Sequence, residues 1–220
     1  MADLVEADEI IERCVFDGAR VMVGGFGLAG MPLTLVAALN RSSKRDLTII
    51  TNNLAEQGTH LGKSLLLGKV RHVIGSYFTT NRDVGRAHAE GRLQVTLLPQ
   101  GTLAEAMRAA GAGLGGFYTP TAVGTALAEG KETREIAGKR YLFQEPLAAD
   151  VALIRAHRAD RLGNLVYSKT ARNFNPVMAT AARTVIAEVD EMVETGALDP
   201  ECIVTPHLYV DHLVLATERL

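Results

Sequence analysis

Apolar residues in the first half of the chain alternate between short uninterrupted runs and runs with helical spacing. The uninterrupted runs predict buried strands over residues 20–23, 47–51, 70–76 and 93–98. Helical spacing predicts helices over residues 7–16, 33–39 and 60–67, and one from Asn81 or Asp83 to Glu90. A further helix over residues 102–110 begins where Thr102 and Glu105 match a capping box. This alternation predicts an α/β fold with an open, mostly parallel sheet flanked by helices.

The second half of the chain has a different pattern. Residues 111–125 are rich in Gly, Thr and Pro and are predicted to form a long loop with a functional role. Residues 131–142, with a turn at 137–139, predict an exposed β-hairpin. Two further strands are expected over 151–156 and 184–189, separated by a helix that Asn175-Pro176 begins. Since no linker and no internal repeat interrupts the chain, we expect a single domain over residues 1–220.

Composition and charge exclude two classes of partner. The chain has 220 residues and a formal net charge of −2, with Lys and Arg scattered singly, which argues against nucleic-acid binding. Residues 21–40 carry no charge, but glycines and Pro32 interrupt them, so a membrane span is not expected. The first residues lack a basic segment followed by an apolar run, and we expect a cytoplasmic protein without a secretory signal. Cys14 and Cys202 have no metal-ligand spacing and are predicted to be small core residues in a reducing compartment.

Polar and glycine-rich segments follow three of the predicted strands. Residues 24–27 (Gly-Gly-Phe-Gly) follow the first, residues 51–53 (Thr-Asn-Asn) the second, and residues 99–101 (Pro-Gln-Gly) the fourth. The carboxyl ends of parallel strands form the edge where such sheets bind ligands. Glycines permit close backbone approach, and a helix N-terminus behind them adds positive potential. Asn52, Asn53 and Gln100 offer uncharged donors and acceptors that suit amides and carboxylates.

The sequence shows no corresponding catalytic group. It contains no Gly-x-Ser-x-Gly, His-x-x-x-His or Cys-x-x-Cys motif. The six histidines are scattered, and nothing marks Glu56 or Glu145, the acids nearest the loops, as an activated nucleophile. We therefore expect a binding pocket with no catalytic residue in this chain and no metal site.

One alternative is a nicotinamide-dependent oxidoreductase. Residues 25–30 form a Gly-x-Gly-x-x-Gly pattern between a predicted strand and a predicted helix. A dinucleotide site would also require an acid at the end of the second strand, where the chain has Thr51-Asn52-Asn53. Pro32 also interrupts the helix expected directly after the last glycine. The context of the pattern therefore disfavours this alternative.

Several motifs, taken together and in order, give the chain a family resemblance. They are residues 17–18, 21–26, 30–32, 51–53, 99–105, 111–121, 130–135, 171–176 and 203–206. In this combination the chain resembles the A-type chain of family I 3-oxoacid CoA-transferases over nearly its whole length.

The resemblance implies a ping-pong transfer of CoA between an acyl-CoA and a free carboxylate, with the nucleophilic glutamate on a B subunit. It implies that Gly24, Gly25, Phe26, Gly27, Leu28, Ala29 and Gly30 form a loop that binds coenzyme A. It further implies that Asn52 and Asn53 contact the pantetheine arm and that Gln100 lies near the substrate carboxylate. Coenzyme A would be a substrate, with no permanently bound cofactor, and the assembly a heterodimer or an α2β2 heterotetramer.

Two further possibilities stay open at this point. Ser76-Tyr77 and Thr102-Leu103 favour acetoacetate as the acid, while 3-oxoadipate is the alternative within the same family. A non-catalytic ligand-binding regulator on the same scaffold is a different class of hypothesis. A true subunit is expected to co-purify with a partner of similar size, whereas a regulator is not.

Overall fold

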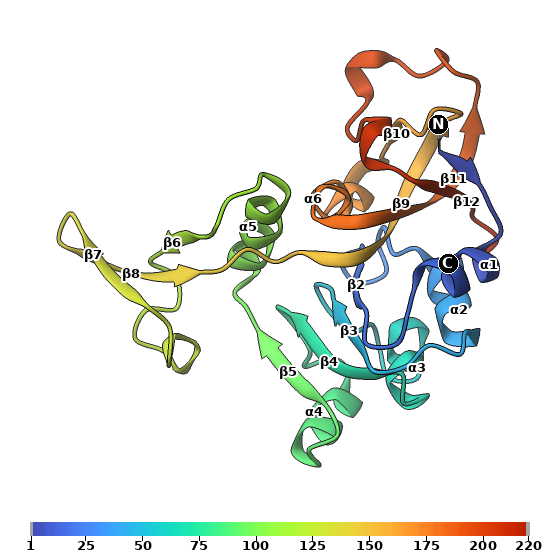
Figure 1. Ribbon diagram of the computed structural model, residues 1–220. Coiled ribbons are helices and arrows are strands. Elements are labelled where there is room, and N and C mark those ends of the chain that lie inside the picture. Colours follow the sequence, from blue (N-terminus) through green and yellow to red (C-terminus); the bar gives the residue numbers. More distant parts are fainter. Residues whose placement is uncertain (1, 219–220) are drawn as a thin grey trace.

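A parallel sheet forms the centre of the structure, a computed structural model that describes residues 2–218 (Figure 1). Within these residues the sheet has nine strands, in the order β1-β12-β11-β9-β2-β3-β4-β5, with β10 paired to β9. Only the β9–β10 pair is antiparallel among the described pairs of this sheet, which confirms the predicted fold class. The strands are β1 (Asp3–Leu4), β2 (Arg20–Val23), β3 (Leu47–Ile50), β4 (Val70–Gly75), β5 (Gln94–Leu97), β9 (Ala149–Asp160), β10 (Leu165–Val166), β11 (Ala182–Val193) and β12 (His212–Leu215).

The strand order reverses between β2 and β9. From β2 the chain adds β3, β4 and β5 outward in one direction, and from β9 it adds β11 and β12 in the other. Val21 of β2 pairs with Val151 of β9 at this boundary, and both side chains are buried. Because a reversal of strand order leaves a crevice beyond the carboxyl ends of the strands, this boundary positions the candidate site.

Helices cover both faces of the sheet. One apolar core contains buried side chains of α1 (Ala7–Cys14), α2 (Leu33–Arg41), α3 (His60–Leu66) and α4 (Arg82–Ala89). A second contains those of α5 (Gln100–Gly111) and α6 (Asn175–Thr180). Both cores include strand residues, which explains why Leu47–Ile50 is an apolar run buried along its whole length. Short 3-10 segments occupy η1 (Ala126–Ala128), η2 (Lys169–Arg172), η3 (Pro200–Cys202) and η4 (His207–Tyr209).

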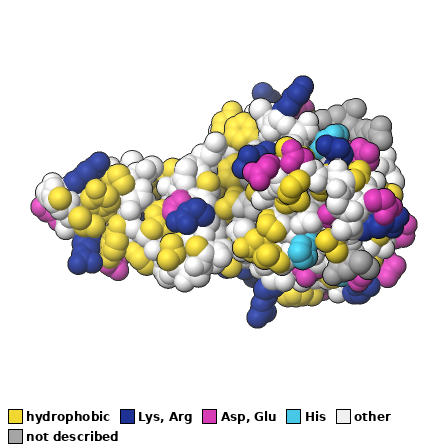
Figure 2. All heavy atoms as spheres, turned by 90° about the horizontal axis from the view of Figure 1, so that it is seen from above, with side chains coloured by type: hydrophobic (Ala, Val, Ile, Leu, Met, Phe, Trp, Pro, Cys, Tyr) yellow, Lys and Arg dark blue, Asp and Glu magenta, His cyan; other side chains and the backbone are white. Residues whose placement is uncertain are grey.

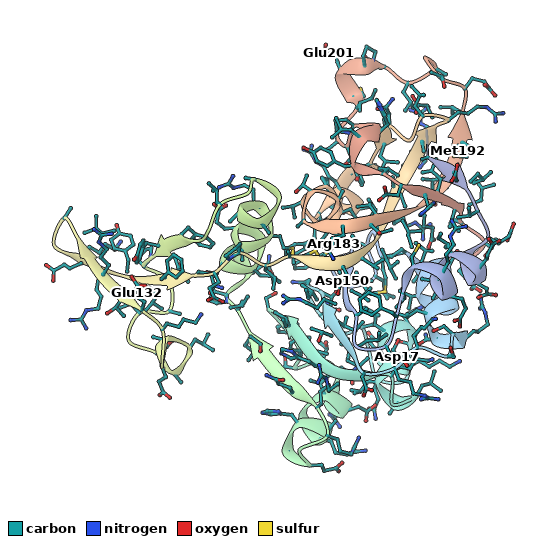
Figure 3. The ribbon with its side chains drawn as sticks, in the orientation of Figure 1. Asp17, Glu132, Asp150, Arg183, Met192 and Glu201 are labelled. Atoms are coloured by element: carbon teal, nitrogen blue, oxygen red, sulfur yellow. The ribbon has the colours of Figure 1, made fainter. Side chains whose placement is uncertain are left out.

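An antiparallel arm extends from the body of the molecule (Figures 1 and 2). It consists of β6 (Phe117–Thr119), β7 (Thr133–Ile136) and β8 (Lys139–Gln144), in the order β6-β8-β7. The predicted hairpin is thus confirmed. Glu132 lies on this arm (Figure 3), where its carboxylate accepts a hydrogen bond from the Tyr118 hydroxyl. The prediction of a continuous loop over 111–125 was wrong in part, because Phe117–Thr119 pairs with β8.

Three local predictions need correction. The capping box is not formed: α5 begins at Gln100, directly after Pro99, and Glu105 pairs with Arg108 instead. Strands β9 and β11 have 12 residues each, twice the predicted length. Cys202 is exposed rather than in the core, and a hydrogen bond to the Asp199 carboxylate raises the pKa of its thiol.

Two searches of residues 2–218 bear on the class of protein. None of the helices there has the length and apolar character needed to cross a membrane. In the same part of the chain, no three His, Cys, Asp or Glu side chains are grouped so as to hold a metal ion.

Candidate functional site

A cavity of about 640 Å³ lies beyond the carboxyl ends of β2, β3, β4 and β5. Every segment that the sequence analysis placed at a strand end contributes to it. The predicted residues that line it are Phe26, Gly27, Leu28, Asn52, Asn53 and Gln100. The structure therefore brings together residues that lie up to 74 positions apart in the sequence, as parallel strands predict.

The glycine-rich loop after β2 divides into a part that lines the cavity and two supports. The Phe26 N–H donates to the Ala29 carbonyl at 3.0 Å, which closes a tight turn with Gly27 (φ +61°) and Leu28 at its centre. Gly24, Gly25 and Gly30 are buried, and together with Ala29 they lie outside the lining. A Cβ on Gly25, whose φ is +114°, would be 3.1 Å from the Met31 backbone. These flanking residues support the turn.

A line of hydrogen bonds fixes the asparagines after β3. The Ala55 N–H donates to Asn53 Oδ1 at 2.9 Å, and Asn53 Nδ2 donates to Asn52 Oδ1 at 3.1 Å. Asn52 Nδ2 then donates to Ser76 Oγ at 2.8 Å and to Gln100 Oε1 at 3.3 Å. Asn52 is 2% exposed, and each of its side-chain polar atoms has a partner in this line. Asn52 is therefore held rigidly at the cavity wall.

Gln100 is the first residue of α5 and an exposed member of the cavity wall. Since Asn52 donates to its Oε1, the other atom of its amide, Nε2, is oriented as a donor. Within residues 2–218 this nitrogen makes no hydrogen bond. An uncharged donor at this place can bind the oxygen of a carboxylate ligand.

Five lining residues were not singled out as site residues by the sequence: Ala55, Glu56, Ser76, Tyr77 and Thr80. Ser76 and Tyr77 follow β4, and both backbone N–H groups donate to the Asn52 carbonyl at 3.1 Å. The same strand-end argument applied to β4 finds these two. Tyr77 and Phe26 are each 51% exposed, so two aromatic rings border the opening of the cavity.

The first turn of α2 is already occupied by a carboxylate. Glu188 of β11 is fully buried, and its Oε2 accepts hydrogen bonds from the N–H groups of Thr34 at 2.8 Å and Leu35 at 3.2 Å. Burial raises the pKa of this carboxyl to about 7, against the opposing effect of these N–H groups and Arg155. The expected positive potential behind the glycines is thus met by Glu188, and a dinucleotide pyrophosphate would find this helix end filled. The oxidoreductase alternative is disfavoured on this ground too.

The acids and histidines named from the sequence do not form a catalytic group at the cavity. Glu56 is the one carboxylate among the lining residues, and it is exposed. Glu145, at the end of the arm, lies outside the lining. The lining also contains none of the six described histidines, which are His60, His72, His88, His157, His207 and His212. The cavity is thus a set of uncharged donors and acceptors without a buried acid or base.

Comparison with known proteins gives one consistent result. The family model described as Coenzyme A transferase matches residues 4–216. The chain is 52% identical over 202 residues to the alpha chain of the acetate CoA-transferase of Escherichia coli strain K12, covering 92% of each chain. It is 50% identical over 210 residues to the A-type chain of the succinyl-CoA:3-ketoacid coenzyme A transferase of Xanthomonas campestris pathovar campestris, covering 96% of this chain and 87% of that one.

A crystal structure of similar fold is an acyl-CoA transferase apoenzyme from Escherichia coli O157:H7. The TM-score is 0.90 and the identity is 22%, over 98% of this chain and 47% of that one. The chain therefore spans about half the length of that enzyme.

Proposed function

This chain belongs to the coenzyme A transferase family, and we propose that it is the A-type chain of a two-subunit enzyme that moves CoA between an acyl-CoA and a 3-oxoacid such as acetoacetate. The observation that carries the proposal is the chemistry of the cavity. Its polar lining consists mainly of fixed amides and hydroxyls, and its one carboxylate is exposed. Such a site binds a thioester and a carboxylate, while the covalent step requires a nucleophile from elsewhere.

In the reaction we propose, a glutamate of the partner chain attacks the thioester carbonyl of the acyl-CoA. The CoA thiolate leaves, and an acyl anhydride forms. The thiolate then attacks the glutamyl carbonyl, which releases the first carboxylate and leaves a glutamyl-CoA thioester. The incoming 3-oxoacid attacks this thioester, and the same steps in reverse give the new acyl-CoA. Coenzyme A is thus a substrate, and no bound cofactor is needed.

The residues of this chain have binding roles in the proposal. The turn at 26–28, supported by Gly24, Gly25, Ala29 and Gly30, contacts coenzyme A, and Asn52 and Asn53 contact its pantetheine arm. Gln100 Nε2 donates to the carboxylate of the acid. A neutral donor suits an enzyme that must release the acid again, since a charged group would retain it more strongly.

The proposed assembly pairs this chain with a B subunit in a heterodimer or an α2β2 heterotetramer in the cytoplasm. The Xanthomonas relative is named as one of two kinds of chain, which supports a partner. The solved acyl-CoA transferase chain, which is about twice as long, supports a partner as well. We propose no nucleic acid and no membrane as partners.

Co-expression of this chain with the product of its neighbouring gene tests the function. The purified complex is expected to transfer CoA from succinyl-CoA or acetyl-CoA to acetoacetate, and the chain alone is expected to be inactive. A panel of acetate, acetoacetate and 3-oxoadipate identifies the acid. A regulator would bind a ligand without any partner or any turnover.

A mass measurement locates the nucleophile. The complex is incubated with an acyl-CoA in the absence of acceptor, denatured, and each chain is weighed intact. We expect the mass of one CoA on the partner and none on this chain. Glu56→Gln, at the exposed carboxylate of the cavity, is expected to keep activity within about threefold. A CoA adduct on this chain, or complete loss of activity in Glu56→Gln, would place the nucleophile here and refute the division between the two chains.

A further inference from the structure

We propose that Asn175 is a positioning residue that fixes the 24–30 loop, and through it the Phe26–Leu28 wall of the cavity. The inference rests on the proposed function for its kinetic consequence and on the contacts of the chain alone for its structural part. It gives a role to residues 173–176, Asn-Phe-Asn-Pro, which the site described above does not use.

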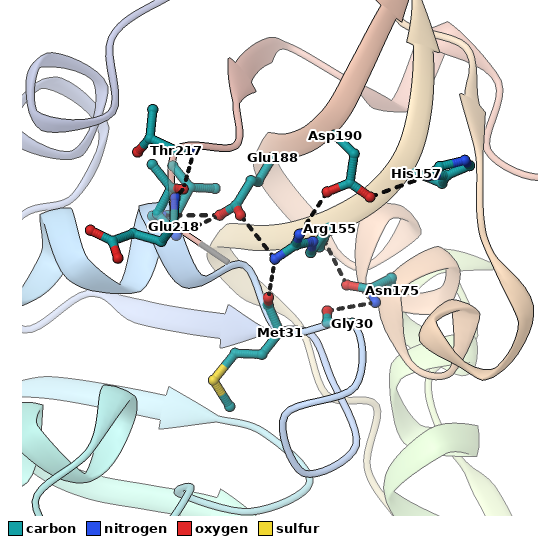
Figure 4. Close-up of polar contacts among 11 residues, drawn as sticks. Gly30, Met31, Arg155, His157, Asn175, Glu188, Asp190, Thr217 and Glu218 are labelled. Carbon is teal, nitrogen blue, oxygen red and sulfur yellow. Dashed lines mark hydrogen bonds and ion pairs between the residues drawn. The ribbon is translucent and has the colours of Figure 1, made fainter. Parts of the chain in front are cut away.

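Asn175 is fully buried at the start of α6, 145 positions from Gly30 in the sequence. Its Nδ2 donates to the Gly30 carbonyl at 3.0 Å and to the Ala171 carbonyl at 2.9 Å. Its Oδ1 accepts a hydrogen bond from the Arg155 N–H of β9 at 2.9 Å. The amide thus joins the loop to the central sheet at the reversal of strand order (Figure 4).

The glycines at the two ends of the loop make room for this amide. A Cβ on Gly24 would be 1.8 Å from Asn175 Oδ1. A Cβ on Gly30 would be 2.2 Å from the Ala171 carbonyl oxygen and 2.9 Å from Asn175 Nδ2. Even a methyl group at either position would therefore displace the asparagine. The glycines and Asn175 form one contact in which each requires the other.

Two further contacts hold the same loop. Asn173 Nδ2 donates to the Ala29 carbonyl at 2.9 Å. Arg155 Nη1 donates to the Met31 carbonyl at 3.4 Å, while its guanidinium pairs with Glu188 and with Asp190 (Figure 4). The backbone on both sides of the Phe26–Ala29 turn is thereby tied to β9 and to the segment before α6. Loss of the central bond at Asn175 leaves the turn without its buried support.

Hydrogen exchange and kinetics test this inference in the assembled complex. In Asn175→Ala we expect amide exchange in residues 24–31 to accelerate at least tenfold, and kcat/KM for the acyl-CoA to fall at least tenfold. Gly24→Ala is expected to do the same, and the double variant Gly24→Ala with Asn175→Ala is expected to be no worse than either single variant. Such non-additivity is the mark of two residues in one contact.

Matched controls separate positioning from general destabilisation. Asn40→Ala removes an amide that bonds the His60 carbonyl and the Ser64 hydroxyl, away from the cavity. It is expected to lower stability without changing exchange in 24–31 or kcat/KM. If Asn175→Ala does not assemble, Asn173→Gly, which removes only the bonds of the neighbouring asparagine, is expected to show the same changes at smaller size.

The outcomes are distinguishable. Unchanged exchange in residues 24–31 overturns the inference whatever the activity. Faster exchange with unchanged kcat/KM, or additive losses in the double variant, overturns the positioning role. If the wild-type complex transfers no CoA at all, the proposed function fails, while the exchange experiment on the loop still decides whether Asn175 holds it.

Discussion

Removal of the Gln100 side chain is the most direct test of how this site recognises a carboxylate. Asn52 Nδ2 holds Gln100 Oε1 at 3.3 Å, so the Gln100 Nε2 donor is fixed in orientation before any ligand arrives. In Gln100→Ala this donor is lost, while the other bond of Asn52 Nδ2, to Ser76 Oγ at 2.8 Å, is kept. The cavity should therefore keep its shape and lose one hydrogen bond to the acid.

The size of the effect follows from the charge of the acceptor. A hydrogen bond to an ionised group contributes about 1.5–3 kcal/mol. At about 1.36 kcal/mol for each factor of ten, this corresponds to a decrease of roughly 10- to 150-fold in kcat/KM for acetoacetate. Gln100→Glu has nearly the same shape and places a second negative charge beside the substrate, so its loss should be larger still.

The assay is the initial rate of CoA transfer in the assembled complex, with each substrate varied in turn. In a ping-pong reaction, kcat/KM for each substrate reports only its own half-reaction. We expect kcat/KM for acetyl-CoA, which has no free carboxylate, to change less than threefold in Gln100→Ala. The matched control is Gln94→Ala, an exposed glutamine on β5 outside the cavity, which should leave both values unchanged. Equal losses for acetyl-CoA and acetoacetate would refute the assignment of Gln100 to the acid.

Three further predictions concern the neighbours of this amide. Asn52→Ala should lower kcat/KM for every acyl-CoA at least tenfold and also weaken acetoacetate, because Asn52 both faces the pantetheine arm in the proposal and holds the Gln100 amide; a loss confined to acetoacetate would contradict this. Gly25→Val should reduce transfer at least tenfold and more than Gly27→Val, since a Cβ at Gly25 meets the Met31 backbone at 3.1 Å whereas one at Gly27 has no atom within 4 Å; equal kinetics of the two variants in the complex would contradict it. The pKa of Glu188 in the folded chain, about 7, lies above its ordinary value of 4.5, so the folded state retains a proton that the unfolded state has lost. Relative to Glu188→Gln at each pH, the wild-type chain should lose about 2 kcal/mol of stability between pH 5 and pH 8 in urea unfolding, and a constant difference would show that Glu188 titrates normally.

The sequence predicted the sheet and most of the cavity for one physical reason. A strand in the middle of a parallel sheet is buried on both faces, so it appears as a short apolar run such as Leu47–Ile50. Once the runs are located, their carboxyl ends must share an edge, and the polar residues that follow them must meet there. This is why Asn52 and Gln100, 48 positions apart, could be placed in one site before their hydrogen bond was observed.

The same reasoning fails where burial does not produce a pattern. Strand β1 has two residues, both exposed, and pairs with the distant β12, so neither periodicity nor length reveals it. All four residues of β7 are exposed, and β6 is three residues of a Gly- and Pro-rich segment. Such strands are defined by their partners. The length of β9 and β11 was missed for a related reason, because both extend into charged segments beyond their apolar cores.

The polar residues behind the site show most clearly what local rules leave out. An asparagine before a proline at the start of a helix favours a cap, yet no side chain caps α6, and the Asn175 amide bonds the Gly30 carbonyl instead. It does so because Gly24 and Gly30 have no Cβ and leave space that any other residue would fill. The glycine pattern and the asparagine are therefore two halves of one contact, separated by more than half of the chain. Read singly, the glycines indicate a phosphate loop and the asparagine a helix cap. Only their contact shows that the loop is shaped by the protein interior, with Glu188 filling the helix end where a phosphate would bind.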